Sequence, residues 1–131
     1  MKKARSLPRV VFKIPTAERE ARVLTMFCTP TKAAWDWSAY IYKEHPELKE
    51  LLRDKKPREI YPHVLTYTRH FLKGKREDLR KVSARYQKKW DTLHDSYLSA
   101  LSDHFETAYP KTRKVITAYV SIVPIYPRFL D

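Results

Sequence analysis

A cluster of cationic side chains between residues 73 and 89 is the strongest functional signal in the sequence. Lys81, Arg85 and Lys88 recur at the i, i+4 and i+7 spacing that places side chains on one face of a helix. Tyr86 adds an aromatic ring next to Arg85, and this mixture is typical of surfaces that contact phosphates and bases. The cluster predicts either a phosphate-binding surface or the solvated face of an amphipathic helix. Its eight members are Lys73, Lys75, Arg76, Arg80, Lys81, Arg85, Lys88 and Lys89.

The composition of the whole chain agrees with an acidic partner. Its 131 residues include 27 Lys or Arg and 15 Asp or Glu, which gives a formal net charge of +12. Such an excess attracts nucleic acid or acidic protein surfaces over a long range. The length and the 43% hydrophobic content predict a single domain over residues 1–131, with truncation at its C-terminal end left open.

The single cysteine, Cys28, excludes an intramolecular disulfide and favours a reducing, cytoplasmic setting. Its neighbours Leu24, Met26 and Phe27 are apolar, so we expect a small buried side chain rather than a nucleophile. A signal peptide is not expected, because Pro8 and charged residues interrupt the apolar stretch near the N-terminus.

The five histidines do not form a metal-binding motif. Neither His-x-x-x-His nor His-Glu-x-x-His occurs, and the pairs His94–Asp95 and His104–Glu106 are expected to be solvated surface residues. One glycine cannot build a glycine-rich phosphate loop. We therefore expect no metal site, no cofactor and no catalytic residue in the chain as given.

The apolar spacing predicts a mostly helical α+β fold with four or five helices. The clearest helix spans about residues 77–109, where apolar residues recur every three or four positions. Its spacing does not keep a strict heptad, so we expect a packed core helix rather than a coiled coil. No apolar segment is long enough to cross a membrane. The other predicted helices cover residues 16–27, 29–44, 47–53 and 62–73, with Gly74 as the left-handed end of the last.

Two segments near the ends of the chain predict β-strands. Residues 9–14 and 114–124 are rich in β-branched and aromatic residues, and the second has apolar groups on both faces. We expect these strands to pair antiparallel and to lie across the long helix. Because two strands alone are marginal in water, another molecule could also supply the neighbouring strand. Val120 and Ile122 would then mediate binding to a protein partner or self-association.

The order of elements in residues 86–130 resembles that of a known family. A long helix containing Trp90 is followed by Tyr109-Pro110, the strand Ile116–Val123, Pro124 and the turn Tyr126-Pro-Arg128. This order resembles the leading part of small gluzincin-type zinc-dependent peptidase-like proteins. In that family a His-Glu-x-x-His helix follows, and no such motif occurs before Asp131. The resemblance therefore implies an inactive N-terminal segment and supplies no zinc ligand.

Three functions are consistent with these patterns. The first is a non-enzymatic basic module that binds nucleic acid or another acidic partner through the Lys/Arg cluster. The second is the N-terminal segment of a zinc-dependent peptidase-like protein. The third is a small inhibitor or adaptor that binds a partner by strand pairing.

Overall fold

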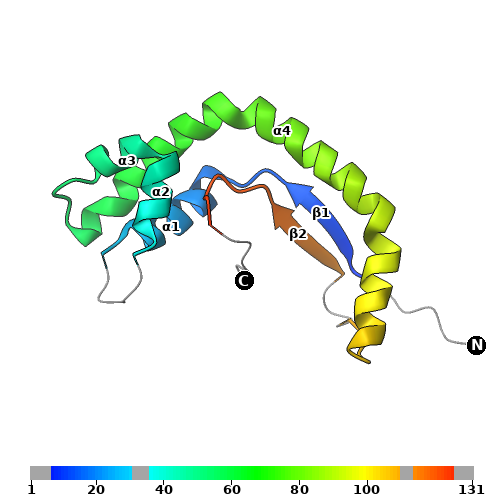
Figure 1. Cartoon of the computed structure of the whole chain (residues 1–131). Helices are drawn as coiled ribbons and strands as arrows, with labels where there is room; N and C mark the ends of the chain where they lie inside the picture. Colours follow the sequence, from blue (N-terminus) through cyan, green and yellow to red (C-terminus); the bar gives the residue numbers. More distant parts are fainter. Residues whose placement is uncertain (1–6, 31–35, 110–113, 126–131) are drawn as a thin grey trace, which may run out of the picture. The chain divides into compact units, whose positions relative to one another are not determined.

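The computed structural model describes residues 7–30, 36–109 and 114–125. In this part of the chain the fold is mostly helical, with four helices and two short strands, as the sequence predicts (Figure 1). No helix in these ranges has an apolar stretch long enough to cross a bilayer. The elements in chain order are β1 (Arg9–Lys13), α1 (Ala17–Cys28), α2 (Ser38–Glu44), α3 (Pro46–Leu51), α4 (Pro57–His104) and β2 (Val115–Tyr119).

Helix α1 begins where its capping residue predicts. The hydroxyl of Thr16 accepts a hydrogen bond of 3.2 Å from the Arg19 backbone N–H, and Glu18 and Glu20 occupy the first turn. The helix ends at Cys28 and buries Leu24 completely. The predicted helix over residues 16–27 is therefore confirmed.

Helix α2 is shorter than the sequence suggests. Thr29 is the C-terminal cap of α1 rather than the start of a helix over residues 29–44. The described part of α2 begins at Ser38, whose backbone N–H donates to Asp36 Oδ1 at 3.0 Å, while residues 31–35 lie outside the described ranges. His45 separates α2 from α3, as expected for a residue that precedes proline, and Pro46 is the first residue of α3.

Helix α4 joins two segments that were predicted as separate helices. It runs through both Pro62 and Gly74, and Gly74 does not adopt a positive φ. An internal proline costs about 3 kcal/mol of helix stability. Burial of Ile60 and Val64 on either side of Pro62 offsets this cost, so tertiary packing overrides the local signal of the proline.

The C-terminal end of α4 is at His104, five residues before the predicted end. Glu106 adopts a positive φ of 51°, and its N–H donates to Asp103 O at 3.2 Å. The Thr107 N–H donates to Ser102 O at 3.0 Å. These two bonds are those of a Schellman motif, in which the residue at the left-handed position is more often glycine than glutamate.

The two strands pair in parallel, so the prediction of antiparallel pairing is wrong. Arg9 lies opposite Val115 and Lys13 lies opposite Tyr119. Parallel pairing requires a crossover connection, and here that connection contains all four helices. Both strands end earlier than predicted, since β1 ends at Lys13 and β2 ends at Tyr119.

The described residues form two compact units. The first contains β1, β2 and the part of α4 from Glu77 onward, and it includes the buried Leu98. The second contains α1, α2, α3, the start of α4 up to Arg76, and residues 121–125. Leu24, Ile41, Leu48, Val64 and Val123 belong to its core.

Replacing Gly74 with alanine should stabilise the protein by about 1 kcal/mol, because alanine is the better helix former. A Cβ at this position would meet no atom within 4 Å. The midpoint of urea unfolding, followed by far-ultraviolet circular dichroism, measures the change. The reciprocal control, Ala84→Gly at an exposed position of α4, should lower stability by a similar amount. Destabilisation by Gly74→Ala would show that the helix ends at this glycine.

Candidate nucleic-acid interface

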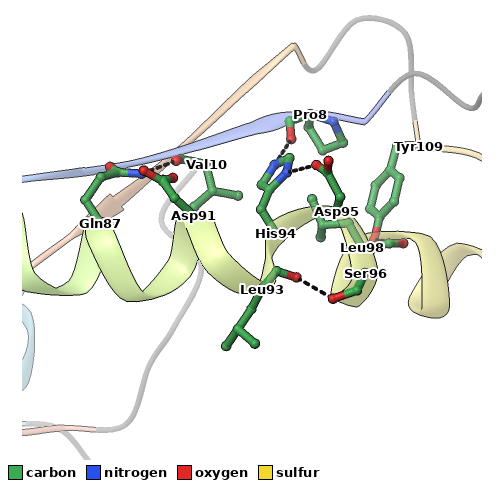
Figure 2. A network of polar contacts seen from close by, with 10 residues as sticks. All are labelled: Pro8, Val10, Gln87, Asp91, Leu93, His94, Asp95, Ser96, Leu98 and Tyr109. Carbon is green, nitrogen blue, oxygen red and sulfur yellow. Dashed lines mark hydrogen bonds and ion pairs between the residues drawn. The ribbon is translucent and has the colours of Figure 1, made fainter.

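The side chain of Gln87 attaches α4 to the outer edge of β1. The ladder with β2 uses the Arg9 N–H and the Lys13 carbonyl, so Val10 and Phe12 direct their peptide groups to the opposite edge. There, Gln87 Nε2 donates to Val10 O at 3.0 Å (Figure 2), and the Phe12 N–H donates to Gln87 Oε1 at 2.8 Å. The Gln87 amide thus supplies one donor and one acceptor, as a peptide group of a neighbouring strand would.

His94 makes a second attachment one residue before β1. Its Nε2 lies 2.7 Å from Pro8 O, and its Nδ1 lies 2.8 Å from Asp95 Oδ1 (Figure 2). Both partners are acceptors, and only the protonated imidazole can donate to both. The hydrogen bond to Asp95, with a further contribution from Pro8 O, therefore raises the pKa of His94. The expected solvated surface histidine is instead a half-buried contact between α4 and the segment that leads into β1.

These attachments determine which side of α4 faces away from the sheet. At 3.6 residues per turn, Lys81, Arg85 and Lys88 lie about 100° to 160° around the helix axis from Gln87. Lys89 lies within the same range, and all four side chains are exposed. We refer to Lys81, Arg85, Lys88 and Lys89 as the basic face.

The charges of the basic face are not neutralised within the described part of the chain. Among the described residues, no Asp or Glu carboxylate lies within 4.0 Å of the charged group of any of these four side chains. Arg80, in contrast, forms an exposed ion pair of 3.4 Å with Glu77, a kind of contact that contributes little to stability. The guanidinium of Arg85 lies 5.8 Å from the centre of the Tyr86 ring, which is 45% exposed. The predicted proximity of a cation and an aromatic ring is therefore present.

The predicted cluster of eight cations divides between the two units. Arg80 and the basic face belong to the first unit, whereas Lys73, Lys75 and Arg76 belong to the second. All three residues of the second group are exposed. Only the four residues of the basic face can therefore be described as one surface.

The two residues predicted to mediate strand pairing already have intramolecular partners. The Val120 N–H donates to Lys13 O at 3.0 Å, which continues the ladder with β1. The Ile122 carbonyl accepts a hydrogen bond of 2.9 Å from His45 Nε2 in the second unit. Any pairing with another molecule would have to use other backbone groups or replace these bonds.

Two buried polar residues of the second unit hold residues 121–125, and no motif in the sequence indicates either of them. The Ser121 hydroxyl donates to Glu20 Oε2 at 2.9 Å, and Glu20 is only 3% exposed. His45 contacts Ile122 through Nε2 and Tyr67 Oη, at 2.8 Å, through Nδ1. Because a carbonyl can only accept, Nε2 carries the proton and Nδ1 accepts from Tyr67 in the neutral ring. Both contacts hold a segment of the chain in place.

Among the described residues, neither Cys28 nor the possible metal ligands are arranged for catalysis or metal binding. Burial raises the pKa of the Cys28 thiol to about 11, which disfavours the nucleophilic thiolate. Within residues 7–30, 36–109 and 114–125, no group of three or more His, Cys, Asp or Glu side chains could hold a metal ion. The resemblance to gluzincin-type proteins stays a prediction.

Comparison with known proteins gives no relative. No family model, no curated protein and no solved structure matches the chain.

The attachment through His94 should weaken as the pH rises. Because the pKa of His94 is raised in the folded state, its stabilising contribution is complete below the unfolded value of about 6.5 and is lost as the pH rises through the folded pKa. A proton NMR titration of the imidazole measures that pKa directly. Asp95→Asn should bring it closer to 6.5, and a folded pKa at or below that value in the unmodified protein would contradict the assignment.

Proposed function

We propose that the chain is a non-enzymatic basic module that contacts the phosphates of nucleic acid through the basic face. The observation that supports this proposal most strongly is that four neighbouring cations are exposed with no carboxylate of the described residues within 4.0 Å. A cation already paired with a carboxylate would have to break that pair before it could contact a phosphate. Among the described residues, the four cations of the basic face have no such ion pair to break.

The spacing of the cations suits a linear polyanion. At a rise of 1.5 Å per residue, Arg85 lies about 6 Å and Lys88 about 10.5 Å along the axis from Lys81. Duplex DNA carries one negative charge per about 1.7 Å of its axis, so each cation can meet a phosphate without a change in the helix. Lysine and arginine contacts to phosphates do not read the bases, and we therefore expect little sequence preference.

An acidic protein is the alternative partner for the same surface. Nucleic acid is favoured because its charges are continuous, and because Tyr86 places an exposed ring next to Arg85 that a base can stack on. The peptidase-segment and strand-pairing functions stay predictions, since no contact described above adds support to either of them.

Neutralising the basic face should weaken binding and its salt dependence together. We expect Lys81→Gln, Arg85→Gln and Lys88→Gln, combined in one variant, to lower affinity for a labelled oligonucleotide roughly tenfold or more at about 0.1 M salt. The slope of log K against log salt should become shallower by about 0.9 for each lost duplex contact. Fluorescence anisotropy with single-stranded and duplex oligonucleotides measures both quantities.

A matched control removes the same charge elsewhere. Lys49, Lys56 and Arg58 are exposed cations of the second unit, and replacing all three with glutamine changes the net charge equally. This variant should keep most of the affinity. An equal loss in both variants would mean that net charge alone drives binding, which contradicts the proposal. Binding of polyglutamate but not of oligonucleotides would favour an acidic protein partner instead.

A further inference from the structure

Tyr86 lies on the border between the basic face and the side of α4 that contacts β1. At 3.6 residues per turn, it is about 60° from Lys89 around the helix axis and about 100° from Gln87 on its other side. Lys89 also follows Tyr86 at the i+3 position, where two helical side chains are neighbours. An aromatic ring thus lies beside the cations of the basic face.

The ring of Tyr86 is held by two neighbours, yet much of the residue is open to solvent. Its centre lies 6.1 Å from that of the Phe12 ring in β1, with the two planes at 62°. The guanidinium of Arg85 lies 5.8 Å from the same centre. Tyr86 is nevertheless 45% exposed. A side chain that is held in place before binding loses little conformational entropy when a ligand stacks on it.

Stacking on this ring requires a nucleic-acid base whose flat face is accessible. In a duplex each base is covered by the neighbouring base pairs, and proteins contact the base edges in the grooves instead. Taking a base out of a duplex costs about as much free energy as stacking it on one aromatic side chain returns. In a single strand the base faces are reached at a much lower cost. The Tyr86 ring therefore adds affinity for an unpaired strand and little for a duplex.

We propose that the basic face selects single-stranded nucleic acid over duplex, with one base stacked on Tyr86. This inference rests on the proposed function, because the phosphates of the same strand contact the basic face. Arg85 and Lys89 lie on the same side of Tyr86 and about 6 Å apart along the axis, so they contact phosphates next to the stacked base. The exposed guanidinium of Arg85 moves from the ring to a phosphate when the base binds.

A second exposed tyrosine of α4 lacks neighbouring cations. Tyr97 is 52% exposed and lies within about 20° of Tyr86 around the axis, but about 16.5 Å away along it. Residues 90–106 contain four acids and no Lys or Arg, so this part of the helix repels phosphates. Tyr97 is therefore a matched control for Tyr86.

Substitution of Tyr86 tests the preference for single strands. Tyr86→Leu keeps an apolar side chain next to Phe12 and removes the ring. It should weaken binding of a single-stranded oligonucleotide about fivefold or more, and change binding of the duplex by less than about twofold. Tyr86→Phe, which retains the ring, and Tyr97→Leu should both bind the single strand as the unmodified protein does. Fluorescence anisotropy at about 0.1 M salt measures the dissociation constants.

A single strand of abasic nucleotides separates stacking from charge, because it carries the phosphates without the bases. The unmodified protein should bind it about fivefold or more weakly than an ordinary single strand, and Tyr86→Leu should bind the two equally. Equal binding of both strands by the unmodified protein, or unchanged single-strand affinity in Tyr86→Leu, would overturn this inference and leave the proposed function in place. A lack of binding to every oligonucleotide would overturn both.

Discussion

The two hydrogen bonds between Gln87 and β1 are the contact on which the arrangement of the first unit depends. A two-stranded parallel ribbon is marginal in water, because each strand has one edge of unpaired peptide groups. The Gln87 side-chain amide pairs with the Val10 carbonyl and the Phe12 N–H on the edge that β2 does not reach. Asp91 accepts a hydrogen bond of 2.9 Å from the same amide nitrogen and so holds it in place. β1 is therefore paired on one side with β2 and on the other with α4.

This attachment also determines what the rest of α4 presents to solvent. Because Gln87 and His94 face the strand, the basic face must lie on another side of the helix. That surface is cationic, and no carboxylate of the described residues lies within 4.0 Å of its four charged groups. A polyanion is the partner proposed above for this surface.

The sequence predicts where helices and strands lie along the chain better than it predicts how they pair and pack. β-Branched residues correctly place both strands, and Thr16 correctly starts α1, because these signals are local. The sequence does not predict the parallel direction of the two strands, because that direction depends on the path of the helical connection between them. Gly74 misleads because one glycine costs a helix interior only about 1 kcal/mol, so it does not have to end the helix. The cationic cluster can be identified in the sequence. Which of its side chains face away from the sheet depends on Gln87, and no pattern in the sequence distinguishes Gln87 from other polar residues.

Amide hydrogen exchange of β1 tests the central contact most directly. The Phe12 N–H points away from β2, yet it should be protected in the unmodified protein because Gln87 accepts its hydrogen bond. Gln87→Met keeps the length of the side chain and removes both hydrogen bonds. In that variant Phe12 should lose protection, while Val11, whose N–H faces β2, should retain more of it. Fast exchange of Phe12 in the unmodified protein, or unchanged protection in Gln87→Met, would contradict the account.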